Sequence, residues 1–503
     1  MAKDVIRITA FDGSPVEFVK KEDPPSGAMK YVYFSPQKDY VVAFFKEKQN
    51  AEQRARLDSI VGRYRHDILE QVGGDYWKQL FCWPEKLVEY EGTLGIVVPA
   101  YASDFFFKND PKRKGAEKEG KWFASAKLLR FVDESERGNF YNFLRISLKL
   151  SQAVRRLHSA GLAHSDLSYK NVLIDPSSGK ACVIDIDGLV VPGKYNPDVL
   201  GTPDFIAPEV ISTQHLPKGD KGKALPSRFT DLHALAVLIY MYLLHRHPLR
   251  GGRYFGPDVD NEETLLMGTS PLFIEHPTDH QNSNMKREYG QDSYDKYLPW
   301  VDIQNFSAEK ICGPHLWKLF QRAFIDGVKE PTKRPIANDW EVALVKTGDM
   351  ILPCSNPKCS QKYFVFDNSK HPKCPFCGTP YKDLLPVLNF YVKQRESFQP
   401  DGSRLMVWSG QSLFKWHVYK NISPNEKLKP EDKPRVGYFQ FFQGKWMLFN
   451  EKIPDMFEIK NGTRRQINPG TFVVLDDMTQ ILLSEDASGG NGRLAVVQLA
   501  GCK

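Results

Sequence analysis

His164-Ser165-Asp166-Leu167-Ser168-Tyr169-Lys170-Asn171 is the stretch that decides the fold, because it places an aspartate five residues before an asparagine. Asp185-Ile186-Asp187 follows at the end of an apolar run, and its first residue stands fourteen places beyond Asn171. A third motif, Gly201-Thr202-Pro203-Asp204-Phe205-Ile206-Ala207-Pro208-Glu209, completes the series. One short motif of this kind can occur by chance. Three in this order and at these intervals indicate phosphoryl transfer from ATP.

The side chains in these motifs suit that chemistry, which needs a positioned hydroxyl and neutralised phosphate charge. Asp166 would accept the proton of the attacking hydroxyl as a general base. Asn171 offers a carbonyl oxygen to one Mg²⁺, and Asp185 offers a charged oxygen to the Mg²⁺ that bridges the phosphates. A lone aspartate in such a place is more often a turn or cap residue. It is the complete set that favours catalysis.

The length of the chain predicts two to four domains, because 503 residues exceed what one ordinary hydrophobic core can organise. The net charge of +7 is modest for this length and argues for no particular class of partner. Residues 1–13 lack the apolar run of a signal peptide, and the longest apolar stretch, 232–244, is too short to cross a bilayer. We therefore expect a soluble, cytoplasmic protein with no membrane partner.

Residues 1–105 are predicted to hold short strands around one helix. Residues 51–72 carry apolar side chains at helical spacing and end at Gly73-Gly74, which predicts the helix. Runs of β-branched and aromatic residues between Pro, Gly and Asp predict strands at 16–19, 31–34, 40–45 and 95–101.

From about residue 122 to 345 the pattern is mainly helical, with the clearest helices at 140–158 and 232–245. The stretch 108–121 is almost wholly charged or small, and it is predicted to be a solvated loop. Residues 385–503 alternate short strand-like runs with turns, which predicts a small all-β sandwich. Its expected strands lie at 415–419, 436–442, 445–449, 471–475, 480–483 and 494–499.

Residues 15–345 resemble a bacterial member of the eukaryotic-type protein kinase superfamily, and the likeness extends beyond the catalytic motifs. Asp231 begins an apolar helix and matches the aspartate that caps the backbone of the catalytic loop in this family. Arg334 matches the arginine that pairs with the glutamate of the Ala-Pro-Glu triplet, here Glu209. The resemblance implies an α+β, two-lobed protein kinase fold, with a β-rich N-lobe over 1–105 and a helical C-lobe over 106–347.

The nucleotide-binding residues that the resemblance implies are less complete in the N-lobe. The family's Gly-x-Gly-x-x-Gly-x-Val loop is represented by residues 25–32, where Gly27 and Val32 remain, and Gly27 would approach the phosphates. Lys46 ends the following strand and would bind the phosphates, although Ala43 stands one place further away than in Val-Ala-Ile-Lys. Its acidic partner stays open among Glu52, Asp58 and Glu70. Adenine would be held by backbone groups of the hinge, at Pro99, Ala100 and Tyr101.

Several positions depart from the family pattern. Ser165 stands where many members have an arginine that binds a phosphorylated activation loop, and between Asp185 and Gly201 the only phosphorylatable hydroxyl is Tyr195. Activity is therefore not expected to depend on Ser/Thr phosphorylation of that loop. Asp187 replaces the glycine of Asp-Phe-Gly and is either a further metal ligand or a turn former. Thr202 is expected to brace Asp166.

Four of the eight cysteines are clustered in residues 350–384. Cys354 and Cys359 form one pair and Cys374 and Cys377 a second, with fourteen residues between the pairs. Two thiolate-bearing turns at this spacing predict a zinc ribbon that holds structural Zn²⁺. Four thiolates leave no open metal position, so catalysis there is not expected. The ribbon would serve as a clasp between the kinase and its tail, or would bind a protein or nucleic acid through nearby lysines.

The C-terminal β region loosely resembles a forkhead-associated domain, a phosphothreonine-binding β-sandwich. Runs at 436–442 and 445–450, the turn 461–463 and the run 467–477 come in the order of that family. The resemblance implies a phosphoprotein partner, with no phosphate-binding residue assigned. The alternative is a generic sandwich used for docking or autoinhibition.

The sequence is thus interpreted as a cytoplasmic, bacterial-type Ser/Thr protein kinase that uses ATP, Mg²⁺ and a structural Zn²⁺ and acts on protein substrates. A similar layout occurs in kinases of bacterial stress and tellurite-resistance operons, which is an analogy only. One alternative is a pseudokinase scaffold that binds nucleotide and recruits partners. Another, less favoured, is a nucleic-acid-associated regulator that acts through the zinc ribbon.

Overall fold

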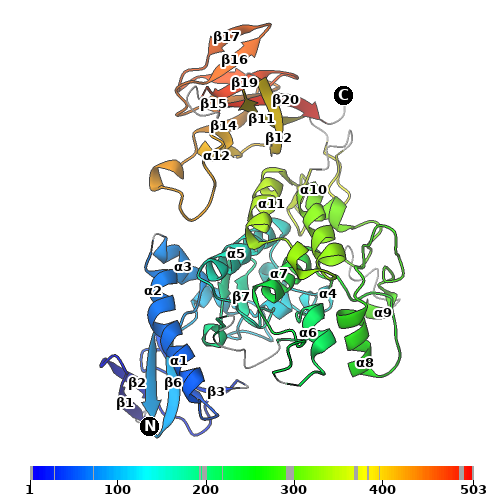
Figure 1. The fold of residues 1–503 in the computed structure, drawn as a ribbon. Helices are drawn as coiled ribbons and strands as arrows, with labels where there is room; N and C mark the ends of the chain where they lie inside the picture. Colours follow the sequence, from blue (N-terminus) through cyan, green and yellow to red (C-terminus); the bar gives the residue numbers. More distant parts are fainter. Residues whose placement is uncertain are drawn as a thin grey trace. The chain divides into compact units, whose positions relative to one another are not determined.

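The computed structural model describes residues 4–27, 29–71, 73–191, 194, 201–217, 219–289, 300–366, 372–381, 384–395, 397–485 and 492–500. The chain forms two compact units. Unit 1 comprises Met1–Gly138, Asn142–Gln304 and Lys318–Glu341, and unit 2 comprises Asn139–Tyr141, Asn305–Trp317 and Val342–Lys503. Figure 1 follows the chain from the blue N-terminal strands of unit 1 to the red strands of unit 2.

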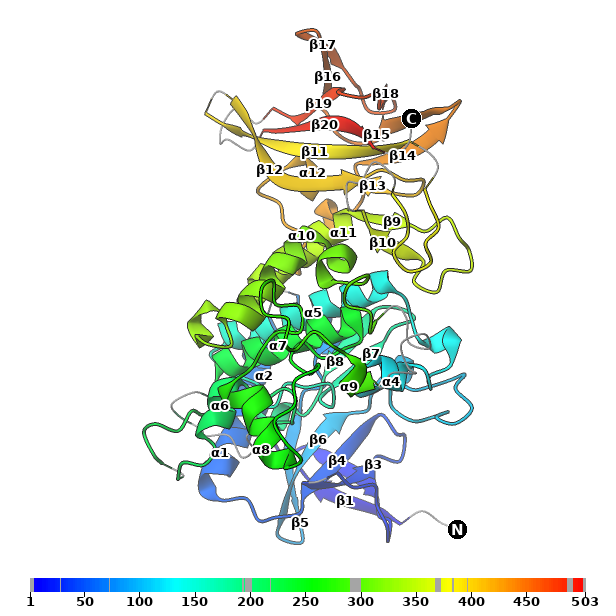
Figure 2. The same ribbon diagram turned by 90° about the vertical axis from the view of Figure 1, so that its right-hand side faces the viewer.

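Antiparallel strands make up the N-terminal end of unit 1 (Figures 1 and 2). Four of them form one sheet in the order β3-β4-β6-β5, and β1 and β2 form a separate hairpin. Phe18 of β2 and Phe44 of β4 share one core cluster, which joins the hairpin to the sheet. The strands are β1 (Val5–Thr9), β2 (Pro15–Val19), β3 (Lys30–Phe34), β4 (Tyr40–Phe45), β5 (Lys86–Tyr90) and β6 (Thr93–Pro99).

The four strands predicted from the sequence are confirmed as β2, β3, β4 and β6, the last beginning and ending two residues early. β1 and β5 were not predicted, although four of the five residues of β1 are β-branched (Val5, Ile6, Ile8 and Thr9). The helix predicted at 51–72 is interrupted. α1 (Ala51–Ser59) passes through a π-helical turn at Ile60–Tyr64 into α2 (Arg65–Leu69), and α3 (Gly74–Leu80) follows.

Helices dominate the rest of unit 1, and two of them confirm the helices predicted at 140–158 and 232–245. The second begins earlier than predicted because Ser227 caps it: its hydroxyl accepts from the Phe229 N–H, and Thr230 accepts from the Ser227 N–H. β7 (Val172–Asp175) and β8 (Lys180–Val183) form a two-stranded sheet in this part of the chain. The helices between residues 126 and 349 are α4 (Ala126–Leu129), α5 (Phe140–Ser159), α6 (Pro208–Thr213), α7 (Arg228–Leu244), α8 (Val259–Glu263), α9 (Lys286–Tyr289), α10 (Ala308–Gln321) and α11 (Ala337–Asp349). Most of α10 and of α11 belongs to unit 2.

The apolar stretch 232–244 belongs to α7, whose side chains from Thr230 to Leu244 are all buried. Packing inside unit 1 therefore accounts for its hydrophobicity. No helix in the described part of the chain is long and apolar enough to cross a membrane.

Residues 108–121 were predicted to form a solvated loop, and this prediction is wrong for Lys118. The side chain of Lys118 is 3% exposed, and its Nζ lies 3.1 Å from Glu136 Oε1 and 2.9 Å from Asp175 Oδ1. Both carboxylates are buried as well. A run of charges in the sequence does not reveal which of them finds partners in the interior.

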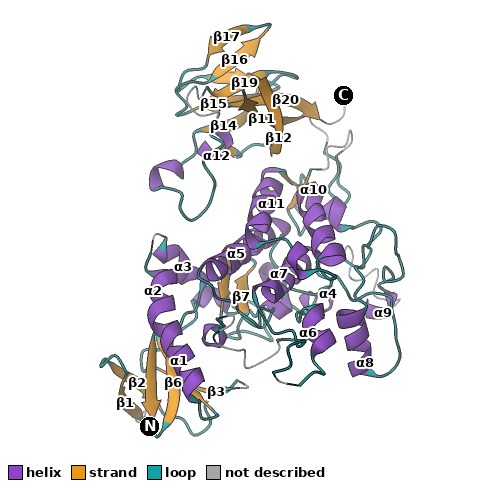
Figure 3. Cartoon of the chain, viewed as in Figure 1, coloured by secondary structure: helices purple, strands orange, loops and turns teal. Residues whose placement is uncertain are grey.

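Unit 2 contains the cysteine segment and a two-sheet β structure (Figure 3). One sheet has the order β12-β11-β20-β19-β16-β17 and the other β13-β14-β15-β18. Leu388 and Ile481 of the first sheet and Phe439 and Leu448 of the second belong to one core, which is the arrangement of a β-sandwich. β9 (Ile351–Pro353) and β10 (Tyr363–Val365) pair beside the cysteines.

Five of the six strands predicted in the tail are confirmed as β14, β15, β18, β19 and β20. The strand predicted at 415–419 is wrong, because these residues form the helical turn α12 (Lys415–Val418). The buried His417 stabilises the turn by accepting at Nδ1 from the Phe414 N–H. The strands are β11 (Leu385–Gln394), β12 (Ser397–Met406), β13 (Ser412–Leu413), β14 (Gly437–Phe442), β15 (Lys445–Asn450), β16 (Phe457–Lys460), β17 (Thr463–Gln466), β18 (Phe472–Val474), β19 (Gln480–Ser484) and β20 (Arg493–Ala500).

Candidate active site

The loop that carries Asp166 is fixed from below by the first turn of α7. The carboxylate of Asp231 accepts from the backbone N–H of His164 at 2.7 Å and from that of Ser165 at 3.0 Å. Its Oδ2 also lies 3.0 Å from Nε2 of His158 at the end of α5. Ser165 takes a left-handed backbone conformation (φ 67°), and two charge-assisted bonds hold the loop in that strained turn. The capping role expected for Asp231 is confirmed.

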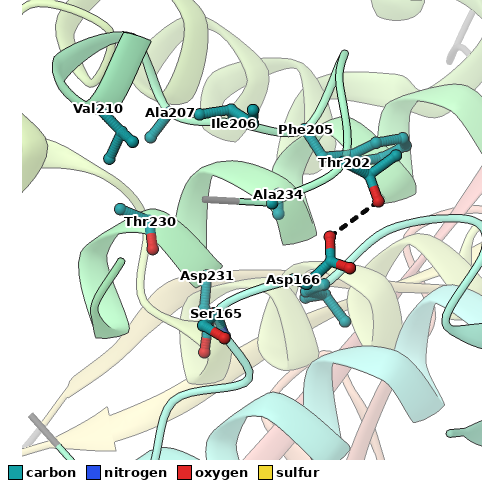
Figure 4. A pocket seen from close by; sticks show the side chains of 12 residues that line it. Ser165, Asp166, Thr202, Phe205, Ile206, Ala207, Val210, Thr230, Asp231 and Ala234 are labelled. Carbon is teal, nitrogen blue, oxygen red and sulfur yellow. Dashed lines mark hydrogen bonds between the residues drawn. The ribbon is translucent and has the colours of Figure 1, made fainter. Parts of the chain in front are cut away.

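Two neighbours orient the carboxylate of Asp166. The hydroxyl of Thr202 donates to Oδ1 at 2.8 Å, a bond that Figure 4 shows between the two side chains at the rim of a small pocket. The amide of Asn171 donates to Oδ2 at 2.9 Å and to the Asp166 carbonyl at 2.7 Å. The predicted bracing by Thr202 is therefore confirmed. With its Nδ2 committed to Asp166, Asn171 has its Oδ1 free of partners within the described residues, so that oxygen suits a hard cation.

Asp185 follows β8 in a left-handed conformation (φ 60°, ψ 38°), which turns its half-exposed carboxylate toward the N-terminal strands. Lys30 at the start of β3 reaches it, with Nζ 3.2 Å from Asp185 Oδ1 and 2.6 Å from Asp187 Oδ2. Neither alternative considered for Asp187, metal ligand or turn former, included this ion pair. Asp187 is buried, and its contact with Lys30 is the shorter of the two.

The charges of this trio are mutually dependent. Burial opposes ionisation of Asp185, but Lys30 and His164 outweigh it and hold the pKa of that carboxyl below its ordinary value. Burial also raises the pKa of Asp187, against the opposing effect of Lys30. Burial alone would lower the pKa of Lys30, yet the two carboxylates raise it to about 12. Lys30 is therefore a cation at neutral pH.

The structure does not bring Lys46 to this trio. Its exposed Nζ donates to the carbonyl of Gly27 at 2.7 Å and lies 5.0 Å from the ring centre of Tyr31. Lys46 follows Phe45 directly, and successive side chains of a strand point to opposite faces. The face expected to carry the phosphate-binding lysine therefore carries Phe45, and Lys46 lies on the other face. This corrects the expectation for Lys46.

None of the three acidic residues considered as partners of that lysine makes such a pair in the described structure. Glu70 pairs with Arg65 and His66, and Asp58 and Glu52 are exposed on α1. The buried residues of α1 are Arg56 and Leu57. The side of α1 that packs on the sheet therefore offers a cation where a carboxylate was expected.

Backbone groups of the hinge already have hydrogen-bond partners within the protein, whereas the loop at Gly27 is open on one side. The N–H of Ala100 donates to Asp39 O at 2.9 Å, and Pro99 O accepts from the thiol of Cys82. A Cβ on Gly27 would meet nothing within 4 Å, so the loop is open on that side. A cavity of about 430 Å³ borders Pro99, Ala100 and Tyr101, but its lining includes no residue of the catalytic loop.

The segment after the catalytic loop is anchored to the helices. Arg334, 1% exposed, forms two parallel bonds with Glu209, and its Nε donates to Gly327 O at 2.8 Å. The predicted Arg334–Glu209 ion pair is confirmed. His247 donates through Nε2 to Asp204 O at 3.0 Å and accepts at Nδ1 from the Leu249 N–H at 3.1 Å. Tyr195, discussed above as the hydroxyl of the activation segment, lies outside the described residues.

Sequence reasoning missed Lys30 and the role of Asp187. One signal was available: Lys46 stands one place too late for Val-Ala-Ile-Lys, and a shift of one residue changes the face of a strand. This one-residue shift argues against Lys46 as the phosphate-binding lysine, but it does not show which lysine would take its place. Lys30 belongs to a different strand, and only the register between β3 and β4 brings it to this face.

The four clustered cysteines converge in unit 2, as their spacing predicted. Their sulfur atoms all lie within 4.8 Å of one another, with Cys354–Cys377 at 3.5 Å and Cys359–Cys374 at 3.9 Å. These distances are too long for disulfide bonds. Four sulfurs on a tetrahedral Zn²⁺, each about 2.3 Å from the metal, lie about 3.8 Å apart, so the donor set fits zinc.

Comparison with known sequences agrees with this geometry. Residues 126–291 match the protein kinase domain family. The match begins at α4 and includes the catalytic loop, Asp185 and the Ala-Pro-Glu triplet. It does not include the N-terminal strands, where Lys30 and Phe45 depart from the usual pattern.

Curated relatives are protein kinases. The chain is 33% identical over 168 residues to the death-associated protein kinase dapk-1 of Caenorhabditis elegans, a match that covers 33% of this chain and 10% of that protein. It is 30% identical over 142 residues to the serine/threonine-protein kinase PknD of Chlamydia felis (24% and 14%). It is 33% identical over 104 residues to the dual serine/threonine and tyrosine protein kinase of Gallus gallus (21% and 10%). The chain spans about a tenth to a fifth of the length of these relatives.

Proposed function

Because residues 126–291 match a protein kinase domain and unit 1 has the mixed strand and helix content of a two-lobed kinase, we propose that this chain transfers the γ-phosphate of ATP to Ser/Thr hydroxyls of protein substrates. One observation carries the proposal. Asn171 and Thr202 both donate to Asp166, and the N–H of Ile184, next to Asp185, donates to the Asn171 carbonyl at 3.0 Å, which supports a common site for the three residues predicted as base and metal ligands.

Each residue has a chemical role in this proposal. The oriented carboxylate of Asp166 accepts the proton of the substrate hydroxyl and aims its oxygen at the phosphate. Asn171 through Oδ1 and Asp185 through its half-exposed carboxylate would hold Mg²⁺, which when bound neutralises phosphate charge. The hinge at 99–101 would contact adenine through backbone groups, and the open loop at Gly27 would cover the phosphates.

The choice of Ser/Thr hydroxyls is supported by the printed names of the relatives, several of which are serine/threonine-protein kinases. We also propose a role in bacterial stress signalling; the match to PknD of Chlamydia felis supports the bacterial setting of this proposal. Phosphoamino acid analysis of a labelled basic protein would test the specificity, since phosphotyrosine alone would contradict it.

The decisive experiment follows labelled γ-phosphate from MgATP into a generic basic protein. Asp166→Asn keeps the shape of the base but removes its charge, and we expect the rate to fall by a factor of about 10² to 10⁴. Asp185→Ala should abolish transfer. Asp220→Asn is the matched control, because Asp220 is an exposed turn residue whose acceptor bond to Gly222 an asparagine can keep.

The same experiment separates the kinase from a pseudokinase scaffold. The loss of the other glycines around Gly27 and the phenylalanine at position 45 favour the scaffold, whereas the oriented Asp166 and the Asn171 Oδ1 without a partner in the described residues favour transfer. Wild-type transfer that disappears in both aspartate variants supports the kinase. Thermal stabilisation by ATP without any transfer would support the scaffold instead.

For unit 2 we propose a structural Zn²⁺ held by Cys354, Cys359, Cys374 and Cys377. The support is their mutual distance, and the four thiolates would complete the metal's coordination without an open site. Such a metal stabilises the short β9–β10 hairpin, which is too small to be stable by itself.

For the tail we propose a phosphoprotein-binding role, supported by the order of its strands and by the two-sheet core. Arg435, an arginine of this region, donates to Glu451 at 3.0 Å, so it would have to give up that partner to bind a phosphate. Binding of a phosphothreonine peptide, with the unphosphorylated peptide as control, tests this role. Equal binding of both peptides would contradict it.

A further inference from the structure

We propose that Lys30, positioned by Asp187, is the lysine that holds the phosphates of ATP in this chain. This inference rests on the proposed kinase function and extends it. It places the phosphate-binding cation on β3, one strand earlier than the sequence suggests. It also means that the acidic partner of that lysine, Asp187, lies in the segment after β8 and not on helix α1.

The register of two strands explains how Lys30 can take this role. Lys30 and Phe45 are directly opposite each other in the antiparallel pair of β3 and β4. Residues opposite each other in such a pair project from the same face of the sheet. Phe45 belongs to the core cluster that includes Leu57 of α1, so this is the face that the helix covers. Lys30 therefore enters the face from which a lysine at position 45 would have reached the site.

The packing of Phe45 is also consistent with a lysine at position 30 in place of one at position 45. It is 6% exposed and fills the place next to Lys30, whose Nζ lies 5.5 Å from the ring centre. An aromatic face attracts a cation at this distance. The ring thus covers one side of the ammonium group and leaves its donors directed at the carboxylates of Asp185 and Asp187.

Asp187 is the residue that fixes Lys30. The two charged atoms lie 2.6 Å apart, and the side chains are 17% and 10% exposed, so the pair is shielded from water. Asp185, the expected metal ligand, is more exposed and lies 3.2 Å from the same nitrogen. A carboxylate that holds the lysine without binding metal leaves Asp185 available for Mg²⁺.

Helix α1 supplies no competing partner. Its buried charged residue is Arg56, and its acidic residues Glu52 and Asp58 are exposed. Both members of the Lys30–Asp187 pair lie outside α1. The position of α1 is therefore not what brings the phosphate-binding lysine into place, and movement of that helix would not switch the pair on or off.

The test compares single variants in the transfer assay, with ATP varied to obtain kcat/KM. Lys30→Ala should lower kcat/KM by about 10²-fold or more, because an oriented donor to the transferring group is lost. Lys46→Ala, which loses only a bond to the Gly27 carbonyl, should cost less than about tenfold on the same scale. Lys48→Ala, at an exposed position two residues further on, is the neutral control.

The positioning role of Asp187 has its own readouts. Asp187→Asn should lower the rate by about 10- to 100-fold, and its effect should largely disappear in a Lys30→Ala background, because both changes remove one interaction. Asp187→Glu, which keeps the carboxylate, should retain part of the rate that Asp187→Asn loses. Additive losses would mean that Asp187 acts independently of Lys30, and they would overturn its assignment.

A relocation variant tests the geometry directly. Lys30→Ala combined with Phe45→Lys returns a lysine to the facing position on β4, and it should regain part of the transfer lost in Lys30→Ala. Thermal unfolding of each variant shows whether it is folded. A Lys30→Ala enzyme that is folded and fully active, or a Lys46→Ala enzyme that is folded and inactive, would falsify the inference while leaving the kinase function intact.

If the wild type transfers no phosphate, the inference is tested by nucleotide binding. The ratio of the affinities for ATP and adenosine, measured by titration calorimetry, reports the contribution of the phosphates. That ratio should fall in Lys30→Ala and not in Lys46→Ala, and equal ratios in both would overturn the assignment. A wild type that binds neither ligand would overturn the inference together with the proposed function.

Discussion

Arg334 forms a bidentate ion pair with Glu209, with Nη1–Oε1 at 2.8 Å and Nη2–Oε2 at 2.6 Å. The two residues are 125 positions apart, and Arg334 is 1% exposed. The same guanidinium donates to the carbonyls of Phe229 at the start of α7 and Gly327. It therefore ties α6, which follows the Thr202 segment, to two other elements of unit 1.

Removal of this arginine should be strongly destabilising. Arg334→Leu leaves the Glu209 carboxylate and two carbonyls without their donor, and we expect a loss of about 3–5 kcal/mol in the free energy of unfolding. Lys333→Ala is the control, because its pair with Glu330 is 56% and 53% exposed and such exposed pairs contribute little to stability. Urea denaturation measures both. Equal losses would contradict the structural role of Arg334.

Lys118 should be a second stabilising cation. Lys118→Met would leave Glu136 and Asp175 buried without their shared partner, at a cost of about 3–5 kcal/mol. Adding Asp175→Asn to that variant should recover part of the loss, because one uncompensated charge is removed. Lys121→Met serves as control, since its pair with Glu119 is about one third exposed. Thermal unfolding compares the variants, and a solvated Lys118 would show no difference from Lys121.

Stability should fall as the pH drops from 6.5 to 4. Burial lowers the pKa of His247 to about 4, and both ring nitrogens are used by the neutral ring. Below pH 6.5 the unfolded chain binds a proton at this histidine that the folded chain does not bind, so unfolding is favoured by up to about 3 kcal/mol at pH 4. Burial lowers the pKa of His245 to about 4 as well, and it acts in the same direction.

The measurement is the unfolding midpoint as a function of pH. His247→Gln should reduce the slope between pH 6.5 and 4, because one of the titrating groups is gone. His215→Gln, at an exposed position, should leave the slope unchanged. A slope that His247→Gln does not alter would assign the pH dependence to other groups.

Zinc removal should act on unit 2. We expect about one equivalent of Zn²⁺ per chain by elemental analysis, and Cys374→Ser should release it, because Cys374 is the fully buried ligand of the four. Release should lower the unfolding temperature of unit 2. Lys358→Ala, beside Cys359 and without a thiol, should retain the metal. A fully stable, metal-free wild type would contradict the proposed site.

The sequence was most informative where function fixes spacing along one segment. Asp166, Asn171 and Asp185 were identified by intervals within 22 residues, and the cysteines by two short pairs. The helices at 140–158 and 232–245 were found because apolar periodicity is a local property. The helical turn at α12 was missed because it depends on the burial of His417 in the sandwich, which no local pattern shows.

The tertiary structure alone decided which charges are buried and which lysine lies beside Asp185 and Asp187. Lys118 stands among exposed lysines in the sequence, and its two carboxylate partners come from distant segments. Lys30 and Lys46 look equivalent as isolated residues. The register of β3 against β4 puts Lys30 on the face of Asp185 and Asp187, and the alternation of side chains along β4 puts Lys46 on the other. The chemistry follows from residue identities along the chain, whereas its geometry follows from strand pairing, which joins residues that the sequence keeps apart.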